Sequence, residues 1–402
     1  MSDFESAVLY TPPSGMTVMG TMRRELSSEK LKRVKIEGFR SIKTADIQFG
    51  DATVLIGANG AGKTNLIGFL QMLSYMMSEN LRLYVDERRG ADSILHFGSS
   101  ATPRLMGELE FARGNESSTY GFILVPAAGD RLLFTHEQVF FKKPGAMAPF
   151  DALLDPGGFE SAVPRAAQVE TDPIKRVCQV FRRRLSEVRV YHFHNTTAVS
   201  GIRGLQNMHE NRALLAQGSN VAVMLHVLLQ RFEGHYRRIV EEMRQILPDF
   251  QDFVLEPDVL RGKEQIELRW ISKYGTERVF GPEHLSDGSI RAVALLTLLL
   301  QPNEFKPGVI VIDEPELGLH PFAVSQIARL INEAAADHQI IISTQSSRIV
   351  SEFEPEQVVV VESQDGQSHF RHLSTEDLSS WLAEYGDLGT LFDMNVTGGA
   401  PV

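Results

Sequence analysis

The first part of the chain alternates short apolar runs with polar or glycine-containing turns, a pattern that predicts β-strands. Apolar and charged residues alternate from Leu31 to Ile36, a second run covers Ala45 to Phe49, and a third is continuous from Thr53 to Ile56. We expect these three strands to form a small β-meander. Four further runs predict an antiparallel β-subdomain inserted into the rest of the fold: 103–111, 119–126, 131–136 and 137–142.

Helical spacing dominates the middle of the chain. The strongest pattern runs from Asn220 to Leu247, and Pro248 ends it. Before this helix the sequence predicts a loop, a helix and a strand, and after it a β-hairpin. The ranges are 143 to about 172 for the loop, 173–186 for the helix, Val188 to Phe193 for the strand, and 265–271 with 277–280 for the hairpin.

The C-terminal part alternates apolar strands with helices, which is typical of a parallel sheet with crossover helices. The run of β-branched residues from Val309 to Ile312 has the continuous apolar character of a buried parallel strand. The other predicted elements are a helix ending at Leu300, a helix from Phe322 to Ala336, a strand from Gln339, a strand from Gln357 to Glu362 and a helix from Thr375 to Tyr385.

Composition excludes some classes of protein but does not indicate a function. The 402 residues are 43% hydrophobic and 23% charged, with a net charge of −11, as in ordinary globular proteins. The longest apolar run, Ala292 to Leu300, is too short to span a bilayer, so we expect no membrane partner. Cys178 is the single cysteine, which excludes an internal disulfide and fits the cytoplasm. Residues 1–29 lack periodicity and a signal pattern and are predicted to be a flexible N-terminal arm.

Two groups of residues have two interpretations each. The basic cluster consists of Lys175, Arg176, Arg182, Arg183, Arg184 and Arg189. We favour a solvated helix face for it over a contact with DNA, because the overall charge is acidic. His192 and His194 alternate in a predicted strand and could bind a metal together. We favour ordinary strand histidines, because no further Cys or His cluster supports a metal site.

The clearest chemical motif follows the strand that ends at Ile56. Residues 57–64 match the phosphate-binding pattern G-x-x-x-x-G-K-[ST], between a strand and a predicted helix from Asn65 to Tyr75. Glycines let the backbone approach an anion, and the amide groups and the helix N-terminus attract phosphate. The predicted nucleotide-binding residues are Gly57, Asn59, Gly60, Ala61, Gly62, Lys63, Thr64 and Asn65. Lys63 reaches the β- and γ-phosphates, and Thr64 offers its hydroxyl to Mg²⁺.

Arg40 lies in the turn between the first two predicted strands. Its side chain could reach the bound phosphates, or it could be a surface turn arginine. We include it among the candidate nucleotide-binding residues.

Three further motifs follow in the C-terminal part. Leu285 to Ser289 (LSDGS) opens a helix, so Ser286 and Gly288 form a second candidate anion site. Asp313 and Glu314 end a buried strand, where α/β sheets present ligands. Asp313 would hold Mg²⁺, and Glu314 would act as the base that polarises the attacking water. Gln345 ends the next apolar strand and is a candidate sensor of the γ-phosphate.

Together these motifs resemble an ABC-type ATPase head, and more narrowly the SMC/RecF/OLD-type branch of AAA ATPases. The narrower resemblance rests on VKIEGFRSI at 34–42, GKTNL at 62–66, LSDGS at 285–289 and DEPELGLHP at 313–321. It implies an α/β fold in which an ABC-type P-loop head has a mixed, mainly parallel core sheet, an antiparallel β-subdomain and an inserted helical lobe. The expected parts are an N-terminal lobe (30–142), an inserted helical and β region (143–282) and a C-terminal lobe (283–402).

The resemblance also implies a homodimer that encloses two ATP molecules. Ser286 and Gly288 of one subunit would contact the γ-phosphate held by Lys63 of the other, and residues 316–321 would cross the interface. The segment from Leu388 to Pro401 is similar to the tail of stand-alone ATPases in this branch.

The chain departs from the family pattern at several points. The signature is LSDGS, in which Asp287 is tolerable near an anion only if it points away. Gln345 stands where a histidine is usual; because glutamine does not titrate, we expect slow hydrolysis with a flat profile around pH 6–8. We find no Q-loop glutamine. The roughly 55 residues after the switch segment contain no Asp-x-Asp pair, so a Toprim nuclease does not fit and we expect a separate nuclease-type effector.

The favoured function is therefore an ATP-hydrolysing dimeric clamp or sensor in DNA repair or anti-phage defence, with double-stranded DNA as a further candidate partner. Two alternatives remain. A nucleotide-gated scaffold would use ATP to hold an assembly with little turnover. The ATPase subunit of a transporter is less favoured, because of the LSDGS variant, the GFRSI opening and the inserted sheet.

Overall fold

The computed structural model describes residues 29–399, except 115, 143–148, 156–157, 170, 172, 198, 261–262 and 276–277. The predicted flexible arm therefore lies outside the described residues, apart from Glu29.

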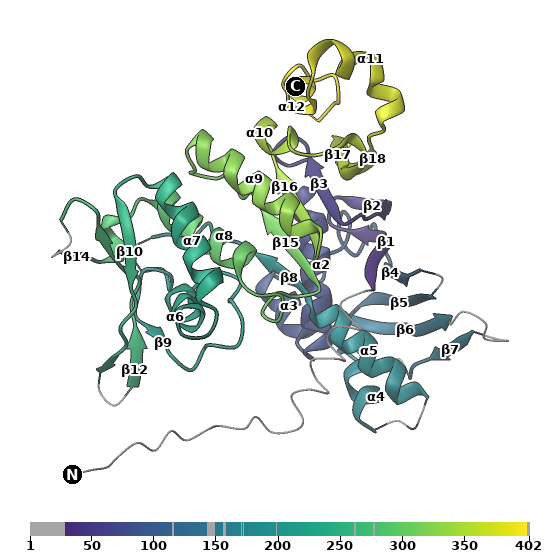
Figure 1. The fold of residues 1–402 in the computed structure, drawn as a ribbon. Helices are drawn as coiled ribbons and strands as arrows, with labels where there is room; N and C mark the ends of the chain where they lie inside the picture. Colours follow the sequence, from purple (N-terminus) through teal and green to yellow (C-terminus); the bar gives the residue numbers. More distant parts are fainter. Residues whose placement is uncertain are drawn as a thin grey trace.

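An antiparallel sheet of six strands forms one side of the molecule (Figure 1). Its spatial order is β2 (Ile42–Gln48), β1 (Lys30–Phe39), β4 (Leu105–Arg113), β5 (Glu116–Ala127), β6 (Arg131–Lys142) and β7 (Phe150–Leu153). The predicted antiparallel β-subdomain is confirmed. The predicted strands 131–136 and 137–142 are one strand, β6. Its register against β5 shifts beside Thr135, and such a bulge interrupts the alternation of side chains that the sequence pattern follows.

A second sheet of six strands is the core of the fold. Its order is β18 (Gln367–His372), β17 (Val358–Gln364), β3 (Ala52–Ile56), β16 (Gln339–Thr344), β15 (Val309–Asp313) and β8 (Val188–Tyr191). All neighbours pair in parallel except β18, which pairs antiparallel with β17. The predicted mixed, mainly parallel core sheet is confirmed.

The predicted meander of the first three strands is wrong. Only β1 and β2 pair with each other, whereas β3 pairs with β16 and β17 in the core sheet. Every residue of β3 is buried, as expected for a strand covered on both faces. The strand that ends at Tyr191 also belongs to the core sheet, although it falls inside the predicted inserted region of 143–282.

Helices pack on both faces of the core sheet. The helices of the described residues are α2 (Lys63–Met77), α3 (Leu81–Glu87), α4 (Val163–Val169), α5 (Ile174–Ser186), α6 (Val221–Arg231), α7 (Glu233–Ile246), α8 (Asp287–Leu300), α9 (Pro321–Ala335), α10 (Ser347–Val350), α11 (Thr375–Tyr385) and α12 (Leu388–Asp393), with short 3₁₀ turns at Pro282–His284 and Pro355–Gln357. Two three-stranded sheets accompany α6 and α7: β10 (Phe250–Val254) with β13 (Arg269–Ser272) and β14 (Val279–Phe280), and β11 (Asp258–Leu260) with β12 (Lys263–Ile266) and β9 (Gln206–Asn207).

Alternating side chains of the core strands build two hydrophobic cores. Ile310 and Ile340 join the core under α6 to α10 and α12, whereas Val311 and Ile341 join the core under α2, α5 and the antiparallel sheet. This arrangement leaves the ends of the strands, rather than the sheet faces, for a site.

Three local predictions in the middle of the chain are wrong. The helix expected from Asn220 to Leu247 breaks at Phe232, whose ring packs edge-on against Phe305 at 5.6 Å and separates α6 from α7. The loop expected at 143–172 contains β7 and α4. The first hairpin strand, 265–271, is divided between β12 and β13, although the pairing of β13 with β14 is antiparallel as expected.

Candidate functional site

The carboxyl ends of β3, β16 and β15 lie side by side in the core sheet. The phosphate loop follows β3, Gln345 follows β16, and Asp313 ends β15. Motifs that are separated by hundreds of residues in sequence therefore meet at one edge, where parallel α/β sheets bind ligands.

The glycines of the phosphate loop have the positive φ angles that the motif requires. The φ values are 153° at Gly57, 81° at Gly60 and 117° at Gly62. A Cβ at Gly57 would lie 2.2 Å from the carbonyl oxygen of Val361, and one at Gly62 would lie 1.9 Å from the hydroxyl oxygen of Ser368. Gly60 has open space around the same position. The loop is thus packed against its neighbours on one side and open at its middle, which fits a cradle for phosphate.

Lys63 begins α2 and points back into the loop. Its ammonium group donates to the carbonyl oxygens of Gly57 at 2.5 Å and Ala58 at 3.1 Å. The residue is 5% exposed, and burial lowers its pKa, whereas the carboxylates of Glu314, Asp313 and Glu316 oppose that shift. A positive group is therefore held at the mouth of the loop among acidic residues.

Thr64 and Asn65 form the next part of the helix. Thr64 is exposed, so its hydroxyl is free to reach a ligand. Asn65 donates to the Ser41 hydroxyl at 2.5 Å and accepts from Arg40 at 3.4 Å. Arg40 thus lies against the first turn of α2; its predicted contact with phosphate stays a prediction.

Asp313 has the properties of a cation ligand. The residue is 7% exposed, and its buried Oδ1 has no hydrogen-bond partner in the part of the chain that the structure describes. A buried carboxylate oxygen without a partner is costly unless a ligand satisfies it. Carboxylate and hydroxyl oxygens are ligands that Mg²⁺ accepts, so Asp313 and Thr64 fit the predicted metal-binding role.

Glu314, Asn59 and Gln345 are connected by hydrogen bonds. The side-chain amide of Gln345 donates to Asn59 Oδ1 at 2.7 Å and to Glu314 Oε1 at 3.1 Å. Glu314 has a φ of 47°, which is uncommon for a residue with a side chain, and its amide donates to the Ser343 carbonyl at 2.8 Å. The structure therefore brings the predicted base, the predicted sensor and the phosphate loop together.

Glu316 is a site residue that the sequence placed only in a predicted interface loop. Its Oε1 accepts from the Thr344 hydroxyl and from the backbone amide of Gln345, both at 2.8 Å. Burial raises the pKa of this carboxyl, and the two hydrogen bonds oppose the shift. Glu316 therefore fixes the backbone from which Gln345 extends. An acid two residues after the DE pair was the only signal for this role.

His192 and His194 also lie at this edge, just after β8. His192 Nδ1 is 3.7 Å from Asp313 Oδ2, and the His194 Nε2 is 3.0 Å from the Asp313 carbonyl oxygen. Burial lowers the pKa of His192, against the effect of Asp313. Within the described ranges, no three His, Cys, Asp or Glu side chains group as metal ligands. The histidines are therefore neighbours of the acidic strand end.

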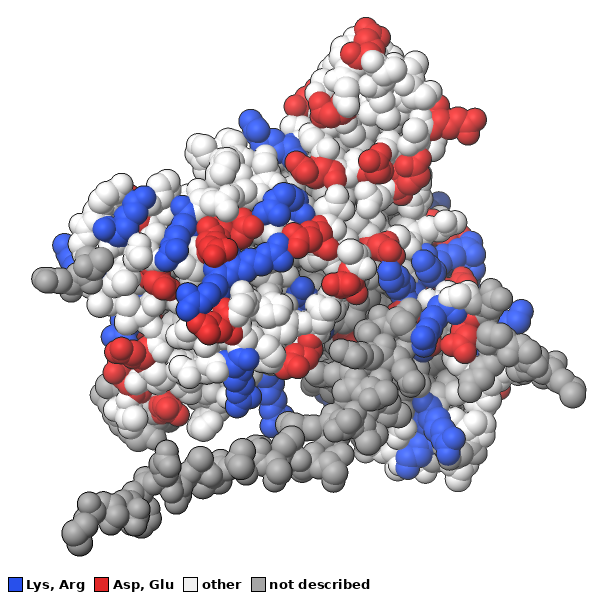
Figure 2. All heavy atoms as spheres, in the orientation of Figure 1, with Lys and Arg blue, Asp and Glu red and all other residues white. Residues whose placement is uncertain are grey.

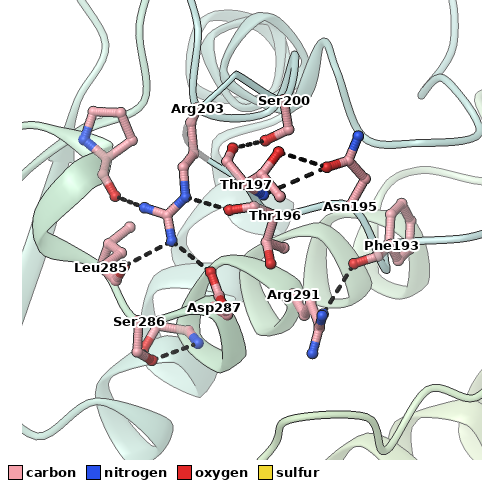
Figure 3. Close-up of polar contacts among 12 residues, drawn as sticks. Phe193, Asn195, Thr196, Thr197, Ser200, Arg203, Leu285, Ser286, Asp287 and Arg291 are labelled. Atoms are coloured by element: carbon pink, nitrogen blue, oxygen red, sulfur yellow. Dashed lines mark hydrogen bonds and ion pairs between the residues drawn. The ribbon is translucent and has the colours of Figure 1, made fainter.

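The signature segment begins α8 (Figure 3). Ser286 caps the helix by accepting from the Ser289 amide at 3.0 Å. Asp287 forms an ion pair with Arg203 at 2.8 Å, and its hydrogen bond with Arg203 lowers the pKa of this carboxyl. The charge that could oppose an anion is thus neutralised by Arg203, a residue that the sequence analysis did not single out.

The signature is packed against the loop that follows β15. A Cβ on Gly288 would lie 2.2 Å from the Gly318 carbonyl oxygen. Arg291 donates to the carbonyl oxygens of Leu317, Phe193 and His194 at 2.9–3.1 Å. The signature helix, the loop after Glu314 and the segment after β8 are therefore joined by direct contacts.

The basic cluster does not form a single solvated face. Arg184 is 7% exposed, pairs with Glu29 and donates to the Ser118 hydroxyl at 2.6 Å. Arg183 lies 3.4 Å from Glu187. The favoured interpretation is wrong for Arg184, which is a core residue because the antiparallel sheet covers it.

Two segments match models of known families. Residues 215–351 match the family described as "AAA domain, putative AbiEii toxin, Type IV TA system", and residues 30–97 match "AAA ATPase domain". Each match contains part of the site, since the second holds the phosphate loop and the first holds Asp313, Glu314 and Gln345.

Curated relatives match over shorter stretches. The energy-coupling factor transporter ATP-binding protein EcfA of Methanococcus maripaludis is 37% identical over 119 residues, which is 26% of this chain and 41% of that protein. A putative ABC transporter ATP-binding protein of Methanothermobacter marburgensis is 36% identical over 91 residues, 22% of this chain and 31% of that protein. The matching stretch spans less than half the length of each relative.

Solved structures match over most of the chain. An Smc head bound to the C-terminal winged-helix domain of ScpA has a TM-score of 0.57 at 17% identity, covering 87% of this chain and 99% of that one. An Smc head with an extended coiled coil, bound to the C-terminal domain of ScpA from Pyrococcus furiosus, has a TM-score of 0.56 at 14% identity, covering 89% and 100%. At these identities the likeness establishes the fold.

The chain thus has the fold of Smc head domains, and two of its segments match models of AAA ATPase domains. The SMC/RecF-like branch that the sequence motifs predict is consistent with this fold. No helix in the described residues has the length and apolar character needed to cross a bilayer.

Proposed function

We propose that this ATPase binds ATP with Mg²⁺, dimerises around two nucleotides and hydrolyses them slowly, as a clamp or sensor in DNA repair or anti-phage defence. A separate effector protein would carry any further activity. The observation that carries the proposal is the hydrogen-bonded set of Asn59, Gln345 and Glu314 beside the buried Lys63.

Each residue of this set has a chemical role in the proposal. Lys63 and the loop amides bind the phosphates, and Thr64 and Asp313 hold Mg²⁺, which would neutralise charge on the β- and γ-phosphates. Glu314 accepts a proton from the attacking water, and the side-chain amide of Gln345 orients both Glu314 and this water. Glu316 positions Gln345, because it holds the backbone amide of that residue.

The dimer is supported by the arrangement of α8. The Ser286 hydroxyl bonds to its own helix at Ser289, and the helix N-terminus forms an anion site with Asp287 turned to Arg203. Leu317, in the loop that the resemblance places at the interface, and Phe322, directly after it, are 40% and 52% exposed. Exposed apolar residues beside an anion site fit a surface that a second subunit covers.

The first experiment compares steady-state ATP hydrolysis by the wild type and Glu314→Gln, with and without double-stranded DNA. We expect the rate to fall at least about 100-fold in the variant, because the base is lost. Binding of ATP should persist and the 44.8 kDa chain should run as a dimer in light scattering. Glu352→Gln, at an exposed position, is the matched control. Hydrolysis at the wild-type rate by Glu314→Gln would contradict the assigned base.

A mixing experiment tests the shared sites. Lys63→Ala and Ser286→Arg should each be inactive alone, because each removes one half of every composite site. An equal mixture should regain roughly a quarter of wild-type turnover, since half of the dimers are mixed and keep one complete site. Lys63→Ala mixed with Glu314→Gln should regain none. Equal recovery in both mixtures would contradict the composite site.

One observation supports the nucleotide-gated scaffold as a second candidate. Gln345 is bonded to both Asn59 and Glu314, so it can hold the ATP-bound arrangement without exchanging protons. Dimerisation with a non-hydrolysable ATP analogue, together with no measurable turnover of ATP, would favour the scaffold. The transporter subunit stays the less favoured alternative, and co-purification with a membrane protein would support it.

A further inference from the structure

The C-terminal lobe, residues 374–399, presents two stacked aromatic side chains to solvent. Trp381 and Tyr385 lie one turn apart on α11, with ring centroids 5.9 Å apart and an interplanar angle of 25°. They are 40% and 37% exposed, whereas Leu378 of the same helix is 6% exposed and packs into the core. Met394, at the end of α12, is 46% exposed. Exposed aromatic pairs are frequent centres of protein–protein interfaces.

The same lobe is acidic throughout. Residues 374–399 contain no lysine or arginine, and five carboxylates: Glu376, Asp377, Glu384, Asp387 and Asp393. Figure 2 shows this lobe at the top of the molecule, with red and white side chains above the mixed charges of the remaining surface. An aromatic surface with one sign of charge selects its partner by charge as well as by shape.

The lobe is fixed to the rest of the fold. The Thr375 amide and hydroxyl donate to the Glu356 carboxylate at 2.7 and 3.0 Å, and Ser351 donates to Asp387 at 3.0 Å. The aromatic pair therefore stands on an anchored helix and is organised before any partner binds, which reduces the entropic cost of docking.

We propose that the outer face of α11 is the docking site for a basic, apolar segment of a partner protein. A second copy of this face would bring like charges together, and DNA or an anionic membrane would meet the same repulsion. This proposal rests on the proposed function, because it describes the surface to which the separate effector protein would bind. Because binding to α11 can be measured without ATP, it and the proposed ATPase cycle can fail separately.

The lobe is also connected to the phosphate loop. After α12, the Thr397 carbonyl accepts from Arg371 at 2.8 Å, and the Gly399 amide donates to Glu362 at 3.2 Å. A Cβ on Gly399 would lie 3.2 Å from the Gly57 Cα. The last residues of the lobe thus contact the first residue of the nucleotide cradle.

The first test uses two labelled amphipathic peptides of equal length, one built from lysine and leucine and one from glutamate and leucine, with fluorescence anisotropy on the full chain. The wild type should bind the basic peptide only. Trp381→Ala/Tyr385→Ala and Glu376→Lys/Glu384→Lys should each weaken binding at least about tenfold. Tyr274→Ala removes an aromatic side chain that is 77% exposed elsewhere and should leave binding unchanged. Equal binding by the wild type and the aromatic variant would overturn the proposal.

The second test identifies the occupant in cells. A photo-crosslinking amino acid at Ser380, an exposed position of α11, is activated and the attached segment is mapped by mass spectrometry. A segment with net positive charge and apolar side chains, lost in the Trp381→Ala/Tyr385→Ala variant, supports the proposal. A crosslink to a second copy of this chain, to lipid or to an acidic segment overturns it.

Discussion

Buried polar groups at the two ends of β16 differ in their hydrogen bonding. At the amino end, Gln339 is 2% exposed and fully bonded: its Oε1 accepts from the Leu31 amide at 2.8 Å, and its Nε2 donates to the carbonyl oxygens of Leu31 and Gly50 at 2.7 and 2.8 Å. At the carboxyl end, the buried Oγ of Ser343 has no partner among the residues described, and neither has Asp313 Oδ1 at the same end of the neighbouring strand β15.

The difference separates residues that stabilise the fold from residues that serve function at the two ends of the core sheet. A buried polar group that is satisfied by the chain tightens the fold, whereas one left without a partner costs stability and persists where a ligand completes it. The backbone follows the same division, because Glu314 keeps an unusual φ of 47° at the carboxyl end. Strain at that position is consistent with a functional constraint. Substitutions at the two ends should therefore have different readouts.

The largest effect is expected at the carboxyl end, in Lys63→Ala. Loss of the buried ammonium group should weaken ATP binding by about 3 kcal/mol, roughly 100-fold, since a charged hydrogen-bond donor to phosphate is removed. The melting temperature should change little. Isothermal titration calorimetry checks the affinity, with Lys43→Ala at an exposed position as control. Unchanged affinity would mean that the loop does not hold the phosphates.

At the amino end, Gln339→Ala should do the reverse. Three hydrogen bonds are lost, and the buried backbone amide and carbonyl of Leu31 and the carbonyl of the exposed Gly50 lose their partner, which should cost about 2–3 kcal/mol of unfolding free energy. The folded protein should bind ATP as the wild type does. Denaturant unfolding and calorimetry check both, with the exposed Gln364→Ala as control. A loss of ATP affinity without a loss of stability would break the division between the two ends.

The sequence predicted the parts of this site that are local motifs. The phosphate loop, Asp313, Glu314 and Gln345 were found because each follows its own apolar strand within a few residues. The contacts that join distant segments gave no such signal. Ser368 donates to the Ala61 carbonyl at 2.6 Å across 307 residues of sequence, and Arg203 neutralises Asp287 across 84. Pairing of that kind depends on the completed fold.

The wrong predictions of secondary structure have the same origin. The β-meander was inferred because β3 follows β2 closely, yet β3 is buried on both faces and pairs with strands from the far end of the chain. A bulge at Thr135 interrupts the alternation of β6, and the long helix breaks at Phe232, whose ring packs against Phe305 from a distant part of the chain. Local periodicity cannot report a break that a distant neighbour imposes.

His338 is an exception at the amino end, because it is a buried polar residue with a ring nitrogen left unsatisfied by the residues that the structure describes. It precedes Gln339, is 7% exposed, and its Nε2 has no partner in the described part of the chain. Burial, assisted by Lys306, lowers its pKa from 6.5 to about 4. The unfolded chain therefore binds a proton that the folded chain does not, so the stability present above pH 6.5 is lost progressively as the pH falls toward about 4.

The size of this loss should be on the order of 3 kcal/mol. His338→Gln should remove that part of the pH dependence, measured as the slope of the unfolding midpoint between neutral and mildly acidic pH. His369→Gln, at an exposed position, should keep the wild-type slope. An identical slope in His338→Gln would show that the buried neutral imidazole does not contribute to the loss of unfolding free energy at acidic pH.

The smallest effect is expected for His192→Ala, and it tests the carboxyl end most directly. His192 lies 3.7 Å from Asp313 Oδ2, on the side opposite the unpartnered Oδ1. If the imidazole orients this carboxylate for a cation, its removal should weaken binding of Mn²⁺ with ATP about tenfold, as for other partners of metal ligands. Electron paramagnetic resonance measures bound Mn²⁺ directly, with Asp313→Ala as the lower limit and His369→Ala as the control. Unfolding stability should stay near that of the wild type, because His192 lies at the end of the strand that is arranged for a ligand. A loss of stability with unchanged Mn²⁺ affinity would place His192 with Gln339, as a residue that holds the sheet rather than the site.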